Sequence, residues 1–152
     1  MNILRTLSLT LILAAVSASA LAAKEEEKID CMIGTEDLQA RIAVHAINGV
    51  VQSFAYYSKW KPYTCSVDAE REDGRSEWKD FSDGTKIVIE KGSLLVNATK
   101  DEYRFNFQNV EREKYCGMSG HLNGTIVIKR NLPYGTPDCG SIEGALMDRE
   151  TE

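Results

Sequence analysis

The sequence predicts an all-β domain, an antiparallel meander of about eight or nine short strands stapled by two disulfides. Three observations lead to this prediction. Apolar and polar residues alternate along most of the chain, pairs such as Asn48-Gly49 separate the alternating runs, and no stripe of period 3.6 competes with them. The composition, 43% hydrophobic and 27% charged over 152 residues, is that of an ordinary globular protein.

The first 23 residues are predicted to be a secretory signal peptide that is cleaved. Arg5 gives a positive start, an apolar core runs from Leu7 to Val16, and small residues dominate the stretch up to Ala23. Cleavage after Ala20 and after Ala22 both satisfy the small-x-small rule, so both sites stay open. We therefore expect a periplasmic or secreted protein without a membrane span.

Residues 24–37 are predicted as a polar N-terminal segment, and residues 38–139 as a single β domain. The first strand shows the clearest pattern, since apolar residues occupy every second position from Leu38 to Ala46 before the Asn48-Gly49 turn. The strands expected from this alternation cover residues 38–46, 50–57, 65–69, 76–81, 85–90, 94–98, 103–107, 115–121 and 125–130. The later turns are placed at Asp73-Gly74, Asp83-Gly84, Lys91-Gly92 and Asn123-Gly124. Residues 140–152 are predicted as a flexible acidic tail.

The meander could close into a small barrel or stack as a two-sheet sandwich. We favour the closed barrel, because closure removes the strand edges that a long meander would otherwise expose to other chains.

Four cysteines, Cys31, Cys65, Cys116 and Cys139, predict two structural disulfides in an exported chain. If the strands alternate in direction, the segment before the first strand and the start of the third share one end of the domain. The start of the eighth and the end of the ninth share the other end. We therefore expect Cys31 to pair with Cys65 and Cys116 with Cys139. With no C-x-x-C and only two histidines, no metal site or cofactor is expected.

The segment from Tyr115 to Gly124 is the first candidate site, because its glycines allow a partner to approach the backbone closely. Ser119 and His121 would share a strand face, as a nucleophile and a base might. The segment has no G-x-S-x-G elbow, and no motif ties a carboxylate to His121, so we expect a binding loop and no enzyme activity.

A second candidate site lies between residues 56 and 63, where aromatic side chains crowd a connection. Tyr57, Trp60 and Tyr63 offer large rigid surfaces with a polar edge, which suits a protein interface. The alternative role for these tyrosines is to plug one end of a barrel.

The Tyr63-Thr64-Cys65 element, the Ser119-Gly120 loop and the later Lys129 resemble the bacterial inhibitors of c-type lysozyme. In that family a loop serine and a strand lysine enter the cleft of the target enzyme. Where the family carries an aromatic residue soon after the Ser-Gly pair, this chain has His121-Leu122-Asn123. The resemblance is confined to these short elements.

The charge balance argues against a nucleic-acid partner. Without the first 23 residues the chain has 17 Lys and Arg against 23 Asp and Glu, a net charge of −6, and its cations are scattered among acids. We expect an exported binding protein that acts on a protein partner, as an enzyme inhibitor or an immunity-type protein. Its predicted contact residues are Ser119, Gly120, His121, Lys129, Tyr57, Trp60 and Tyr63. The alternative is a small barrel that binds an apolar or amphipathic ligand in a cavity lined by Tyr103, Phe105 and Phe107.

Overall fold

The computed structural model describes residues 24–34, 39–60, 63–119 and 121–143, with only the backbone of Trp60. The predicted signal peptide, Gly120 and residues 144–152 lie outside the described residues. The elements, in chain order, are β1 (Glu26–Gly34), β2 (Gln39–Ile47), β3 (Val50–Trp60), β4 (Tyr63–Glu70), β5 (Glu77–Phe81), β6 (Gly84–Ile89), β7 (Gly92–Ala98), β8 (Glu102–Glu111), α1 (Arg112–Cys116), β9 (His121–Lys129) and β10 (Gly140–Glu143).

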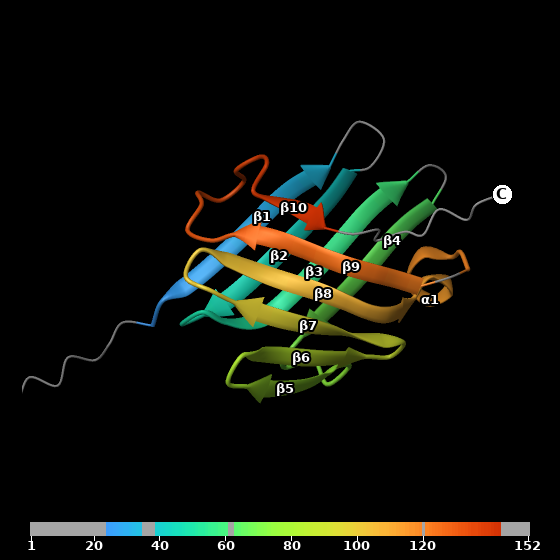
Figure 1. Ribbon diagram of the computed structural model, residues 1–152, viewed down its shortest axis with the longest axis horizontal. Coiled ribbons are helices and arrows are strands. Elements are labelled where there is room, and N and C mark those ends of the chain that lie inside the picture. The colour runs from blue at the N-terminus through green and yellow to red at the C-terminus, as the bar shows by residue number, and fades with distance from the viewer. Residues whose placement is uncertain (1–23, 35–38, 61–62, 120, 144–152) are drawn as a thin grey trace, which may run out of the picture.

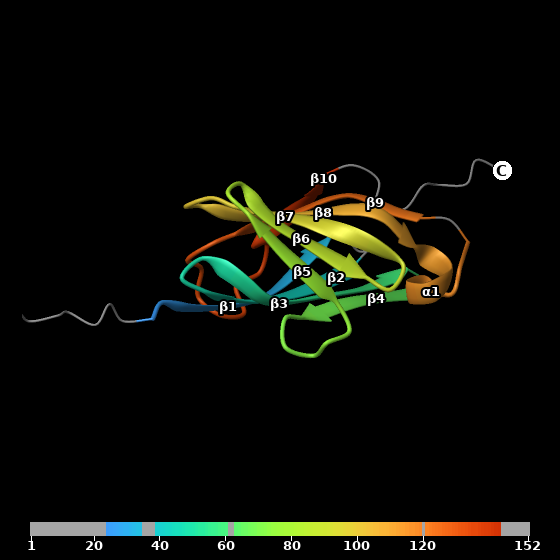
Figure 2. The ribbon, with the colours of Figure 1, turned by 90° about the horizontal axis from the view of Figure 1, so that it is seen from below.

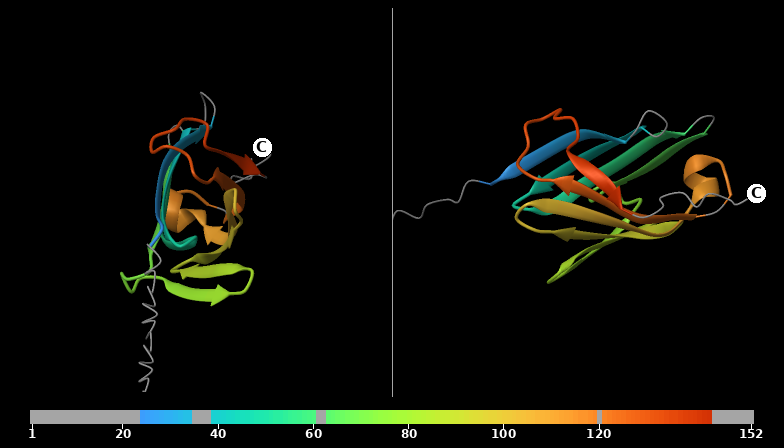
Figure 3. Two further views of the ribbon diagram at one scale, coloured as in Figure 1. Left: turned by 90° about the vertical axis from the view of Figure 1, so that its left-hand side faces the viewer. Right: turned by 45° about the horizontal axis from the view of Figure 1, so that its top comes forward.

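The strands form two antiparallel sheets that stack face to face (Figures 1 and 2). The four-stranded sheet has the order β1-β2-β3-β4, and the six-stranded sheet has the order β10-β9-β8-β7-β6-β5. The all-β antiparallel prediction is confirmed, but the preference for a closed barrel was wrong. The meander breaks after β4, because the chain crosses through residues 71–76 to the other layer and β5 pairs only with β6. The end view in Figure 3 shows the two separate layers.

The hairpin between β2 and β3 forms at the predicted Asn48-Gly49 turn. Asn48 has φ 50° and Gly49 has φ 77°, the two positive values that a primed two-residue turn requires. The Asn48 side chain also accepts a hydrogen bond from the Glu25 backbone N–H at 2.9 Å, which ties the start of the described chain to this turn.

Strand β1 lies in the segment that we predicted to be polar. Its charged residues Glu26, Lys28 and Asp30 alternate with buried apolar ones, and Ile29 and Ile33 face the other sheet. The charges masked a period of two that the structure makes plain. Strand β10 was also missed, because its four residues show too short a pattern, yet it pairs along β9.

The predicted strand over residues 115–121 was wrong. Pairing of β8 with β9 shifts between Phe107 and Val110, next to Asn109 at φ 52°, and the chain then turns into α1. Gly117 ends the helix in the left-handed conformation that glycine adopts without a steric penalty. The predicted turn at Asn123-Gly124 was also wrong, since β9 runs through both residues.

These differences changed the disulfide pairing. The bonds join Cys31 to Cys139 and Cys65 to Cys116, so the predicted pairs were wrong. The extra strand at the start and the helix in place of a strand reversed which cysteines share an end. Each bond links the four-stranded sheet to the part of the chain that carries the six-stranded sheet. Two disulfides are typical of proteins in oxidising compartments outside the cytoplasm.

Aromatic side chains fill the space between the sheets. Phe54 stacks on Phe105 with ring centroids 4.3 Å apart, and Tyr56 meets Phe107 edge-on at 5.6 Å. Phe105 also contacts Tyr103. The residues predicted to line a ligand cavity, Tyr103, Phe105 and Phe107, are thus packed core residues with at most 2% of their surface exposed.

Two arginines tie the sheets together at opposite edges. Arg71 donates to the Val51 carbonyl of β3 and, through both terminal nitrogens, to Asp80 of β5 at 2.8 Å. Arg130 donates from Nε to Glu27 of β1 at 3.0 Å and stacks over the ring of Tyr103 in β8. These polar contacts supplement the apolar core.

Candidate functional site

The outer face of the four-stranded sheet is the candidate binding surface. Strand pairing aligns Asp30, Ala43, Ala55 and Asp68 in one row across β1 to β4, with the two alanines in the middle. Because small side chains floor the centre while longer ones rise at both edges, the face is hollowed into a groove of about 430 Å³. Figure 2 shows no helix or strand stacked against this face, which is turned away from the other sheet.

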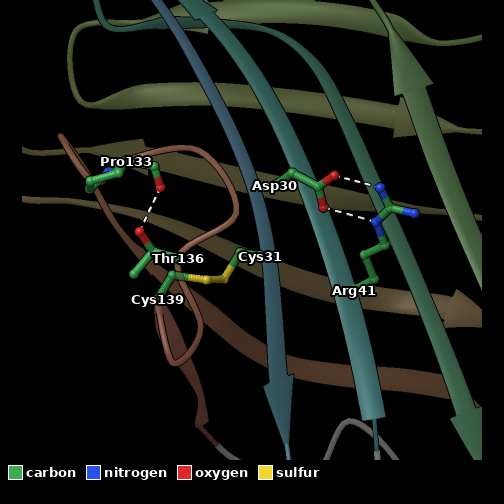
Figure 4. Close-up of a disulfide and its surroundings, with 6 residues drawn as sticks. All are labelled: Asp30, Cys31, Arg41, Pro133, Thr136 and Cys139. Atoms are coloured by element: carbon green, nitrogen blue, oxygen red, sulfur yellow. Dashed lines mark hydrogen bonds and ion pairs between the residues drawn. A yellow bond between two sulfur atoms is a disulfide. The ribbon is translucent and has the colours of Figure 1, made fainter.

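Tyr134 forms the wall of the groove beside β1. The loop that carries it folds over the sheet edge and is fixed at its end by the Cys31–Cys139 bond. The Tyr134 hydroxyl donates to Asp30 Oδ2 at 3.0 Å, while most of the ring stays exposed. A hydrogen bond of 2.6 Å from the Thr136 hydroxyl to the Pro133 carbonyl holds the turn next to the disulfide (Figure 4).

Asp30 is held in place from the other side by Arg41. The guanidinium donates to both carboxylate oxygens, with Nε 2.8 Å from Oδ1 (Figure 4). These bonds, opposed by partial burial and aided by Tyr134, keep the pKa of Asp30 below its ordinary value. The carboxylate is therefore ionised at neutral pH and acts as a fixed acceptor that orients Tyr134.

The opposite wall lies along β4 and the segment that follows it. Arg75 Nη2 lies 3.0 Å from Asp68, and Arg75 Nε donates to Asp73 at 2.7 Å. A hydrogen bond from the Arg75 backbone N–H, with further help from its side chain, lowers the pKa of Asp73. Glu70 also lines the groove and forms no ion pair with any other described residue.

Exposed apolar side chains continue the surface beyond the groove. Met32 and Tyr57 share a cross-strand row with Arg41 between them, and about half of each of these two side chains is exposed. Tyr57 was a predicted contact residue. The alanine floor and Tyr134 were not predicted, because outward-facing positions can be identified only once strand register is known.

The other predicted contact residues lie elsewhere. Tyr63 begins β4 and His121 begins β9, and the Cys65–Cys116 bond places both at the α1 end of the sandwich. Lys129 ends β9, eight residues after His121 and therefore roughly 26 Å away. Ser119 precedes β9, so it does not share a strand face with His121. Gly120 and the Trp60 side chain lie outside the described residues.

A second hollow lies between the turns at the opposite end of the sandwich from α1. The β2–β3 turn, the β5–β6 turn and two residues of β7 enclose a cleft of about 340 Å³. Val50 and Phe81, two of the most exposed large apolar side chains, line it, and the carboxylate of Asp83 lies at its rim. Its lining is therefore amphipathic.

No cluster of His, Cys, Asp and Glu among the described residues is arranged to hold a metal ion. Within the same ranges, no helix has the length and hydropathy needed to cross a membrane. A scan against models of protein families finds no matching family, and searches of curated proteins and of solved structures find no match.

Proposed function

We propose that the protein is an exported, non-enzymatic binding protein that acts on a protein partner through the outer face of β1 to β4. The observation that carries this proposal is the preformed groove, whose alanine floor lies between two walls fixed by hydrogen bonds. Walls that are already ordered lose little conformational freedom on binding, which favours affinity. An enzyme inhibitor and an immunity-type protein are the two roles that this form of recognition suits.

The size of the face supports a protein partner. Four strands about 4.8 Å apart and roughly eight residues long cover about 500 Å² in projection. A standard protein interface buries about 800 Å² on each partner. The face, together with Tyr134, Met32 and Tyr57, thus supplies most of the area that a small stable complex uses.

The charge of the groove favours a basic partner. Three carboxylates line the groove, against two cationic side chains and one histidine. The chain without its signal peptide also carries an acidic excess, which would speed association with a basic surface. We expect a lysine or arginine side chain of the partner to lie along the alanine floor and reach Glu70.

The test uses the oxidised protein without residues 1–23. A partner is first captured from envelope and culture-supernatant extracts and identified by mass spectrometry, and its affinity is then measured by calorimetry. Ala55→Arg fills the groove from an exposed position and should weaken binding at least tenfold, whereas Ser141→Arg, an exposed change on β10, should not. Both variants should keep the melting temperature of the wild type.

The same experiment separates the groove from the residues predicted at the α1 end. If Tyr63→Ala or His121→Ala abolishes binding while Ala55→Arg leaves it intact, the groove proposal is wrong and the contact surface lies beside α1. Saturable binding that is insensitive to all of these changes would exclude both surfaces.

The cleft beside Phe81 favours a second candidate function, the binding of an apolar or amphipathic small ligand. Its volume lies within the range of about 300 to 1,000 Å³ found for ligand pockets. Native mass spectrometry of the purified protein should then reveal a bound molecule that Phe81→Asp removes and Tyr57→Asp does not. A protein that carries no ligand in either form, and binds none from the same extracts, would exclude this function.

A further inference from the structure

Arg112 is a buried arginine without an anionic partner among the described residues. It is the first residue of α1 and has 3% of its surface exposed. Its Nη2 lies 2.9 Å from the sulfur of Met118, a weak acceptor for a charged donor. Its Nε is buried and has no hydrogen-bond partner. A guanidinium placed in this way loses hydration without compensation, which is costly.

Two further unpartnered donors lie at the same end of the core. The hydroxyls of Tyr56 and Ser58 are buried on the inner side of β3 and form no hydrogen bond. Burial raises the pKa of Tyr56, so its hydroxyl stays protonated.

The topology brings the three groups together. Ser58 pairs with Cys65, and Cys65 is bonded to Cys116, one helical turn after Arg112. Tyr56 packs against Phe107, five residues before Arg112. Strands β3 and β8 both run towards α1, so their last inward-facing residues meet at this end (Figure 1).

We propose that Arg112, Tyr56 and Ser58 form an enclosed site for a small anion of halide size between the two sheets. All three groups can donate a hydrogen bond, and one carries a positive charge, which is the chemistry that an anion requires. Because all three side chains lie in the packed core, the site excludes larger anions. The bound ion would hold α1 against β3, in addition to the neighbouring disulfide.

The test measures thermal unfolding of the oxidised protein while chloride or bromide replaces methanesulfonate at constant ionic strength. A native-state site predicts a saturable rise in melting temperature, about 5 to 10 °C at a halide concentration 100 times the dissociation constant. Ser58→Ala and Tyr56→Phe should each weaken halide binding by roughly five- to tenfold, since each removes one hydrogen bond. Arg112→Gln should abolish the response. Arg104→Gln, at an exposed arginine of β8, is the control and should keep it.

A crystal soaked in bromide should show an anomalous peak within hydrogen-bond distance of Arg112 Nε. A halide response that Arg104→Gln reduces as much as Ser58→Ala does would indicate a general salt effect and overturn the proposal. So would Ser58→Ala and Tyr56→Phe variants that are more stable than the wild type and show no halide response, because the hydroxyls would then be merely unpaired. These two variants keep the test decisive if Arg112→Gln does not fold.

Discussion

Replacing Glu27 with glutamine should destabilise the protein more than any other single loss of a surface charge pair. Glu27 Oε2 accepts a hydrogen bond from Tyr103 at 2.7 Å and one from Arg130 at 3.0 Å, and Oε1 accepts one from the backbone of Asn131 at 3.0 Å. Only 14% of the Glu27 side chain and 13% of the Arg130 side chain are exposed, so solvent screens the pair weakly. Glu27 therefore joins β1 to the end of β9 and to the core of the other sheet.

The magnitude follows from these contacts. A hydrogen bond to a charged group contributes about 1.5 to 3 kcal/mol, but the three share one carboxylate and glutamine keeps one acceptor. We expect Glu27→Gln to lower the free energy of unfolding by about 3 kcal/mol. For a chain of this length, that corresponds to a fall in melting temperature of about 6 to 12 °C.

The pH dependence gives a second measurement. Burial raises the pKa of Glu27, but the bonds from Asn131, Tyr103 and Arg130 outweigh it and hold the pKa below the unfolded value of 4.5. As pH falls, the unfolded chain therefore takes up this proton before the folded chain does. The contribution of Glu27 is complete above about pH 5 and is lost as pH falls through the folded-state pKa. The stability curves of wild type and Glu27→Gln should converge in acid.

Urea unfolding of the oxidised proteins at neutral and acidic pH tests both statements. Glu77→Gln is the matched control, since its ion pair with Lys79 joins side chains that are more than half exposed. That control should cost less than about 0.5 kcal/mol. A loss in Glu27→Gln as small as in the control, or a difference from wild type that does not shrink with acid, would refute the reasoning.

Three further predictions concern the framework. Peptide mapping without reduction should recover the Cys31–Cys139 and Cys65–Cys116 pairs, which close loops of 108 and 51 residues, and removing either should cost about 4 to 5 kcal/mol in urea unfolding. Gly92→Ala should cost several times more than Gly74→Ala in the same assay: an added Cβ at Gly92, where φ is 122°, would lie 2.6 Å from a neighbouring Cα, whereas Gly74 at φ 70° has open space. Arg71→Lys, which loses the two-point contact between the sheets, should lower the melting temperature by about 3 to 6 °C; an unchanged value would show that packing alone holds this edge.

The sequence predicted most of the strands because their register with solvent is simple. Between Val50 and Phe107, apolar residues that alternate with polar ones are buried in strands joined by short turns, as at Asn48-Gly49. The failures have specific physical causes. Charged residues at every second position concealed β1, and positive φ values at Asn109 and Gly117 ended pairing where the alternation alone would have continued it.

The candidate site was much less predictable. Tyr57 was found from its aromatic character, but the groove depends on Ala43 and Ala55, which are notable only as outward neighbours in paired strands. Tyr134 reaches the face because a disulfide between residues far apart in sequence fixes its loop. Whether a barrel or a sandwich forms depended on the single crossing after β4, which no local pattern encodes.

The two disulfides have a consequence for the life of the protein outside the cell. The chain passes from one sheet to the other only once between β4 and β5, through residues 71–76, and both sulfur bridges span the same divide. A protease that cuts this exposed crossing would produce two fragments that remain covalently joined at two points. The nicked molecule would migrate as one species until a reductant is added. Both sheets, and every surface that they carry, would thus survive the cut at the crossing.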